Sequence, residues 1–240
     1  MKKPLILLVA GGAALAAFTR ARRARRDVER ASRPADVGFM YAMHAAMRRD
    51  LERLGEASRR RPGIDPAPEE LTDGWALLRS QLEFHHQAED EDLWPKLRQR
   101  IQDPAQLEEI DEMVREHALI PPALEAVGDA LASRADLGPA VSTLTDIVCS
   151  HLDHEERSVL PLVERHLTDA EWHDFLDIER GKRTPRQRVE FLGWVLDDAT
   201  PDDAAPVLAE LPAPGRLVYR HIIKPRHDAR NLWSTEPVYA

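Results

Sequence analysis

Apolar residues recur at helical spacing along this chain. In a stretch that begins near Asp36, Met40, His44, Met47 and Leu51 fall on one face of a helix. Three further stretches behave alike, at about residues 69–101, 104–133 and 139–167. No segment alternates apolar and polar residues for long enough to predict a strand. The pattern therefore predicts an all-α protein.

The connections between these four stretches are short. An Asp-Pro pair at 103–104 opens the third stretch, and Leu-Gly-Pro at 137–139 separates it from the fourth. Short connectors make successive helices antiparallel neighbours, so residues 36–167 are predicted to form an up-down-up-down four-helix bundle. Pro121 and Pro122 predict a bend within the third helix.

Residues 168–240 are predicted to form a C-terminal extension of short helices. Thr168 and Glu171 have the spacing of a capping box, and Thr-Pro pairs at Thr184 and Thr200 are helix-start signals. These helices are expected to pack on the bundle, as a lid over it or as the face of a homodimer. The sequence pattern does not decide between the two arrangements.

The formal charge of −9 is unevenly placed along the 240 residues. Residues 1–33 carry nine basic and two acidic residues, a charge of +7, which leaves −16 for the rest. A body this acidic is not expected to bind nucleic acid. Cys149 is the only cysteine, which excludes an intrachain disulfide and makes this residue a small buried hydrophobe by expectation.

The hydrophobic N-terminal segment allows three interpretations. Residues 4–19 are uncharged and an arginine-rich connector follows. As a helix the segment would reach roughly 24 Å, short of the ~30 Å hydrocarbon core of a bilayer. The arginines favour a membrane anchor with a cytoplasmic body at the inner face of the membrane. A signal peptide with Ala14-Leu15-Ala16 as its cleavage site and an extension without structural consequence are the alternatives.

The chain contains one chemical pattern twice. Residues 85–95 read HHQAEDEDLWP and residues 151–161 read HLDHEERSVLP. In both, a histidine and a glutamate four residues apart lie on one helix face, and a proline follows ten residues after the histidine. Superposing the prolines matches His85 with His151 and Glu89 with Glu155. This register leaves His86 and His154 outside the ligand set, beside it or at the surface.

The other two helices supply one inward histidine each, His44 and His117. Two carboxylates that face each other inside a bundle repel, and a cation between them removes the conflict. Four imidazoles and two carboxylates suit a pair of iron ions, with zinc or manganese as less suitable metals. A ferritin-like site would need Glu-x-x-His on two helices, whereas only Glu83 and His86 provide it.

Together these motifs resemble the hemerythrin-like proteins, or HHE cation-binding domains, over about residues 36–167. The resemblance implies a four-helix bundle with an oxygen-bridged non-haem di-iron centre, in which histidines are terminal ligands and both carboxylates bridge. Carried over to this chain, the implied metal ligands are His44, His85, Glu89, His117, His151 and Glu155.

Two departures from the oxygen-carrying members qualify the implied function. Those members have a second histidine on the third helix, one turn further along, where this chain has Pro121, and an Asp in place of Glu155. One iron is therefore expected to lack a protein ligand. We expect a protein that binds or senses O2 or NO or handles iron. A di-iron enzyme acting on peroxide or NO and a metal-free helical interaction module are the alternatives.

Overall fold

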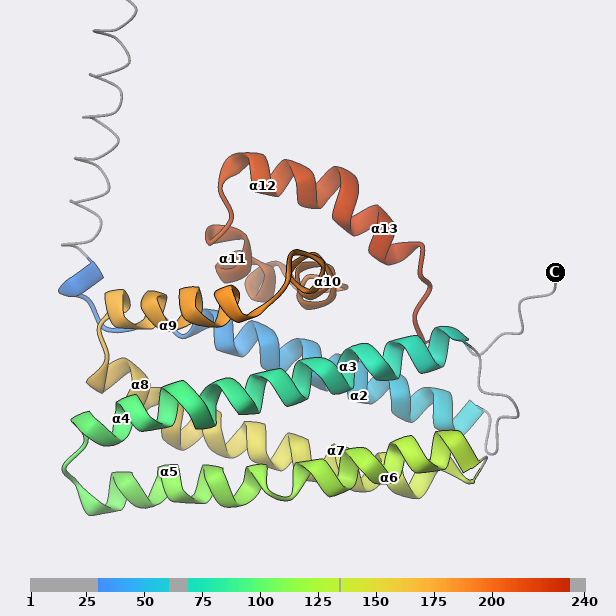
Figure 1. The fold of residues 1–240 in the computed structure, drawn as a ribbon, viewed down its shortest axis with the longest axis horizontal. Helices are drawn as coiled ribbons and strands as arrows, with labels where there is room; N and C mark the ends of the chain where they lie inside the picture. The colour runs from blue at the N-terminus through green and yellow to red at the C-terminus, as the bar shows by residue number, and fades with distance from the viewer. Residues whose placement is uncertain (1–29, 61–68, 134, 234–240) are drawn as a thin grey trace, which may run out of the picture.

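The computed structural model describes residues 30–60, 69–133 and 135–233, and within these ranges the protein consists of helices without a strand (Figure 1). The predicted all-α fold is confirmed. Four rods form the bundle and run in alternating directions (Figure 1). They are α2 (Gly38–Arg60), α3–η1–α4 (Glu69–Ala88, Glu89–Leu93, Trp94–Arg100), α5–α6 (Pro104–His117, Ile120–Ser133) and α7–η2–α8 (Leu137–His154, Glu155–Val159, Leu160–His166).

The second and fourth rods each contain a π-helical turn, η1 and η2, that begins at a glutamate. Pro95 and Pro161 lie one turn later and have no N–H to donate to the preceding turn. The backbone widens instead, so that the N–H of Trp94 donates to the carbonyl of Glu89, five residues back. Leu160 donates to Glu155 in the same way. Such widened turns inside α-helices are frequent at functional sites.

The third rod is interrupted, but not at the prolines themselves. The break lies at residues 118–119, between α5 and α6, and Pro121 and Pro122 fall in the first turn of α6. The predicted bend is therefore present a few residues earlier than expected. Proline is tolerated in a first helical turn because the N–H that it lacks would have no intrahelical partner there.

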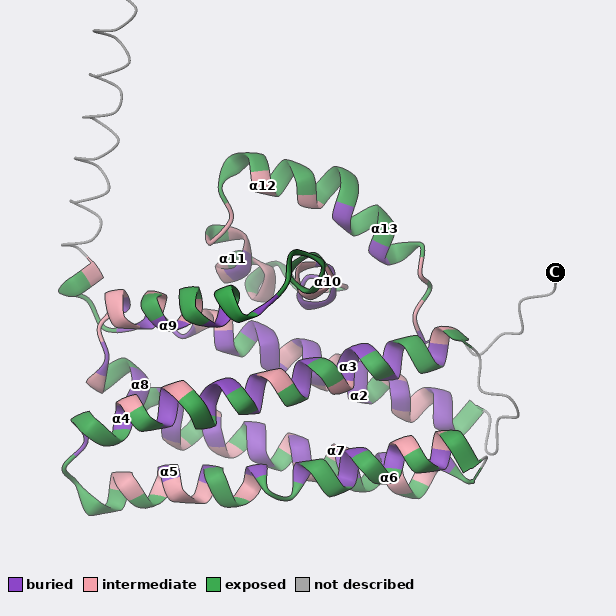
Figure 2. Ribbon diagram, viewed as in Figure 1, coloured by how far each residue is buried: buried purple, intermediate pink, exposed green. Residues whose placement is uncertain are grey.

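Two apolar cores fill the bundle, one towards each end. The first includes Met47, Leu78 and Leu144, and the second includes Leu93, Ile110 and Val163. Each rod contributes a buried histidine, and the second and fourth rods each add a buried glutamate, near the place where one core gives way to the other along the rod. Figure 2 shows the rods buried along their inner faces. The middle of the bundle is thus a polar layer within an apolar interior.

The C-terminal helices cover one side of the bundle. They are α9 (Asp169–Lys182), α10 (Pro185–Val195), α11 (Pro201–Ala209), α12 (Ala213–Val218), η3 (Tyr219–Ile223) and α13 (Lys224–Asp228). Figure 1 shows them over the side formed by α2 and α3. The capping box between Thr168 and Glu171 is present, and Thr184 and Thr200 each cap the helix that follows.

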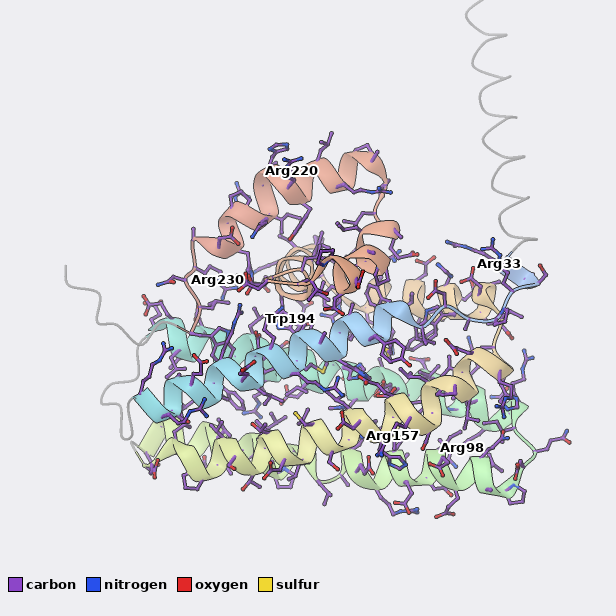
Figure 3. The ribbon with its side chains drawn as sticks, turned by 180° about the vertical axis from the view of Figure 1, so that it is seen from behind. Arg33, Arg98, Arg157, Trp194, Arg220 and Arg230 are labelled. Atoms are coloured by element: carbon purple, nitrogen blue, oxygen red, sulfur yellow. The ribbon has the colours of Figure 1, made fainter. Side chains whose placement is uncertain are left out.

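A buried aspartate joins this cover to the bundle. Asp50 on α2 is 1% exposed, and its Oδ2 accepts a hydrogen bond of 2.8 Å from Nε1 of Trp194, which lies over α2 in Figure 3. Its Oδ1 accepts from Nε of Arg49 at 2.9 Å. The carboxylate therefore holds α10 against α2 and keeps a buried indole N–H satisfied.

The predicted membrane anchor, residues 4–19, lies outside the described residues. Among the residues that the structure does describe, no helix has the length and apolar character needed to cross a bilayer.

We predict that Asp50→Ala lowers the free energy of unfolding by about 3 kcal/mol, because it leaves an indole N–H and an arginine without their buried partner. Chemical denaturation followed by circular dichroism measures this loss. Asp73→Ala is the control: Asp73 is half exposed with one ion pair to Arg230, so its loss should cost at most about 0.5 kcal/mol. Equal effects of the two substitutions would contradict this role of Asp50.

Candidate metal centre

Five imidazoles and two carboxylates converge at the middle of the bundle. All seven residues are buried, with exposed fractions between 0 and 7%. They are His44 of α2, His85 and His86 of α3, Glu89 of η1, His117 of α5, His151 of α7 and Glu155 of η2. The six residues proposed from the sequence are thus brought together, and His86 joins them.

These side chains form two groups that have one member in common. His86, Glu89, His117 and His151 make the first group, and His44, His85, Glu89 and Glu155 make the second. Within each group, one potential ligand atom per residue lies within 4.8 Å of all the others. Either group could hold a metal ion.

Glu89 faces both groups with different atoms. Its Oε1 lies 3.4 Å from Nε2 of His85, and its Oε2 lies 3.5 Å from Nε2 of His117. Each carboxylate oxygen is thus directed at one of the two groups. Glu155 belongs only to the second group, where its Oε2 lies 3.1 Å from Nε2 of His44.

Apart from the contacts among themselves given above, the atoms that point inward have no hydrogen-bond partner in the described part of the chain, which is rare for buried polar groups. They comprise Nε2 of all five histidines and both carboxylate oxygens of Glu89 and Glu155. Leaving so many donors and acceptors unpaired would cost several kcal/mol for the carboxylates alone. A bound cation is the physical explanation, since it would take these lone pairs as ligands.

Three further carboxylates hold the outer nitrogens of the histidines. Nδ1 of His44 donates to Glu156 at 2.8 Å. Nδ1 of His117 donates to Asp90, and Nδ1 of His151 donates to Glu116, both at 2.9 Å. A proton on Nδ1 leaves the lone pair of Nε2 free and fixes the direction of the ring, as carboxylate partners of metal-bound histidines do.

Each of these three carboxylates is adjacent in the sequence to a residue of the centre. Asp90 and Glu156 directly follow the two inward glutamates, and Glu116 directly precedes His117. An acidic residue next to a ligand lies about 100° around the helix and can reach the outer nitrogen of a histidine on a neighbouring rod. The acidic run after His86 therefore contributes to the centre as well as to the solvent-exposed surface.

The electrostatic interactions among these side chains agree with this role. Burial and the neighbouring imidazoles lower the pKa of His85 and His86 well below the usual value, which keeps both rings neutral. Burial and the charge of Glu155 raise the pKa of Glu89 well above its ordinary range. Burial alone would lower the pKa of His44, but Glu155 and Glu156 raise it to about 9. The raised pKa values favour protons on Glu89 and His44, and these protons provide positive charge that a metal ion would otherwise supply.

His86 differs from the expectation. It was assigned outside the ligand set, yet it is 7% exposed and its ring centroid lies 4.5 Å from that of His117 and 5.1 Å from that of His151. The superposition of the two motifs matches His86 with Leu152, which is an apolar core residue, and so gave His86 no role as a ligand. It did not take into account that α3 is buried over a wider arc, between the bundle and the C-terminal helices. Residues three and four before Glu89 both share its face, which was the available signal.

His154 lies outside the centre, as expected. Its Nδ1 pairs with Glu116 at 2.7 Å and its Nε2 with Glu109 at 3.0 Å, at the half-buried edge of the bundle. Arg48 is half-buried and pairs with Glu156. Tyr41 is 40% exposed. Cys149 is half-buried and belongs to neither group.

The family model of the hemerythrin HHE cation binding domain matches residues 35–163, more than half of the chain. This range contains all five imidazoles and both carboxylates of the centre. The resemblance inferred from the sequence motifs is confirmed. Neither a curated protein nor a solved structure matches the chain.

We predict that His86→Leu lowers the amount of metal bound at saturation, because it removes one of four donors from the first group. His166→Leu is the control, since His166 of the same bundle hydrogen-bonds Gln106 and contacts neither group nor the carboxylates that hold its histidines. Elemental analysis of the purified variants, with circular dichroism as the check on folding, makes the comparison. Equal metal content of His86→Leu and the unaltered protein would exclude His86 as a ligand.

Proposed function

We propose that this chain, which belongs to the hemerythrin HHE cation-binding domain family, holds two non-haem iron ions and binds a small ligand such as O2 or NO at them. One observation carries the proposal. Glu89 directs one carboxylate oxygen at each of two groups of buried donors whose inward atoms have no other partner. That arrangement suits a carboxylate shared by two cations, which supports the proposal.

The chemistry of the donors supports iron. The centre offers imidazole nitrogens and carboxylate oxygens and no thiolate, which suits iron and manganese and does not select soft ions such as Cu(I). Zinc would fit the same atoms, but it has no redox chemistry. A pair of bound irons supplies open coordination positions and electrons to a diatomic ligand.

The protein leaves room for such a ligand. Each group contributes four residues, and iron commonly takes six ligands, so exogenous molecules would complete the coordination. The addition of His86 gives the first group three histidines, which removes the deficit expected from Pro121. Pro121 in place of a histidine argued against reversible O2 binding. His86 supplies a histidine in its stead, which supports this function again.

The surrounding residues would exclude water from the centre and hold the histidine rings in position. The centre lies between two apolar cores, and Trp94, which is 1% exposed, packs with its ring centroid 6.3 Å from that of His117. Apolar surroundings that exclude water strengthen electrostatic interactions within the centre and suppress side reactions with water. Asp90, Glu116 and Glu156 would hold the three rings in place while a ligand enters or leaves.

Tethering at the inner face of a membrane through residues 4–19 also belongs to the proposal. It rests on the uncharged segment and the arginines that follow it.

We predict that the unaltered protein binds about two iron ions per chain and that Glu89→Gln/Glu155→Gln binds about one, because the substitutions remove the carboxylate shared by both groups and the other carboxylate of the second group. Iron content by elemental analysis tests this expectation. The matched control is Glu83→Gln/Glu91→Gln, which removes two half-exposed carboxylates of the same region that pair with Arg79 and Lys182. The bridging role is wrong if the double variant of the centre keeps the full iron content.

We also predict that anaerobically reduced, iron-loaded protein develops a visible absorption band with O2 and loses it again when O2 is removed. Reversal indicates binding, whereas irreversible bleaching with consumption of peroxide indicates an enzyme. Optical titration of the reduced protein distinguishes the outcomes. If the protein is expressed in iron-rich medium and still contains no iron after purification, that result would instead favour a metal-free interaction module.

A further inference from the structure

A cavity of about 380 Å³ lies between the bundle and the C-terminal helices. Residues of α2 and α3 form one side, and residues of α9, α10 and α11 form the other, as the arrangement in Figure 1 allows. His85 and Glu89 are among the lining residues, so the cavity borders the candidate metal centre. Two thirds of its lining comes from beyond residue 163, outside the region that matches the family.

The cavity is larger and more apolar than a diatomic ligand requires. Its walls include Phe39, Met43, Phe84, Phe191 and Val207. At the ~30 Å³ that a water molecule occupies in the liquid, its volume corresponds to roughly a dozen non-hydrogen atoms. Pockets of this size and character hold small organic molecules.

One buried cation faces this apolar space. Arg183 is 8% exposed, and its guanidinium stacks on the rings of Phe84 and Phe191, 3.6 and 4.6 Å from their centroids. Its Nη1 donates to Oε1 of Gln81 at 2.9 Å. No ion pair joins it to a carboxylate in the part of the chain that the structure describes. Burial lowers the pKa of this side chain to about 10, so it remains charged at neutral pH.

The carboxylates of the C-terminal helices that line the cavity already have partners. Glu179 pairs with Lys182 at 2.9 Å, and Glu210 pairs with His173 at 3.0 Å. Among the described residues, Arg183 therefore has no direct ion pair, although the charge of Glu179 acts on it from nearby. A buried guanidinium without a directly bound carboxylate favours the entry of an anion. An arginine is well suited to a carboxylate because its planar fork can donate two parallel hydrogen bonds.

The position of Arg183 sets a length for the ligand. Its contacts are with Gln81 and Phe84 of α3, whereas the metal centre begins at His85 and includes Glu89. The eight residues from Gln81 to Glu89 span ~12 Å along the helix axis. A chain-like molecule anchored at Arg183 would therefore extend along α3 towards the metal ligands.

We propose that this cavity binds an apolar monocarboxylic acid of about a dozen non-hydrogen atoms. Its carboxylate pairs with Arg183, and its hydrocarbon lies among the aromatic and aliphatic walls towards His85 and Glu89. Binding requires Arg183 and the cavity but no metal. The inference can thus hold or fail independently of the proposed di-iron function.

Isothermal titration of the full chain with decanoate, below its micelle concentration, tests the proposal. Decanoate has about the right volume, and decanol is the matched uncharged probe of the same chain length. We expect saturable binding of one decanoate per chain in both metal-free and metal-loaded protein, about tenfold tighter than that of decanol. Equal affinity for the two probes, or no binding of decanoate, would overturn the proposal without any variant.

A variant then locates the carboxylate. Arg183→Gln should weaken decanoate binding about tenfold and decanol binding much less, because the neutral amide cannot pair with a carboxylate, whereas both probes lose the same packing against the guanidinium. Arg186→Gln is the control, since Arg186 is 88% exposed, pairs with Glu190 and does not line the cavity. Circular dichroism verifies that both variants fold. Undiminished decanoate binding to folded Arg183→Gln would refute the assignment of Arg183.

Discussion

Attraction between converging donor atoms and a cation is the interaction on which the interior of this bundle depends. Without positive charge, Glu89 and Glu155 repel each other in a water-free environment, and the raised pKa of Glu89 expresses that cost. With metal present, the same atoms would link all four rods, in addition to their apolar contacts and the hydrogen bonds between histidines and outer carboxylates. Folding and metal content are therefore expected to be coupled, because the site exists only when all four rods are assembled.

The backbone contributes to this centre through two prolines. Pro95 and Pro161 widen the helical turns that begin at Glu89 and Glu155, so the two carboxylates occupy equivalent places on the second and fourth rods. The outer carboxylates Asp90 and Glu156 then fall within reach of histidines on other rods. Short sequence motifs thus encode the ligands, the local helix geometry and part of the hydrogen-bonding support at once.

The C-terminal helices change what the bundle can do. They bury the outer side of α3, which allows adjacent histidines on that helix to be buried together, and they enclose the apolar cavity beside His85. The link through Asp50 and Trp194 fixes α10 on α2. A bundle without this cover would present α3 to solvent and would lack the wall that holds Arg183.

The sequence by itself determined the helical rods, their order and six converging side chains, because helical periodicity and the repeated His-x-x-x-Glu motif are local properties of the chain. The capping box at Thr168 was readable for the same reason. Only the tertiary structure decided that His86 faces the centre, that Asp90, Glu116 and Glu156 hold its histidines, and that Arg183 faces a cavity. Each of these depends on which neighbour covers a given helix face, and that neighbour is contributed by residues far away in the sequence.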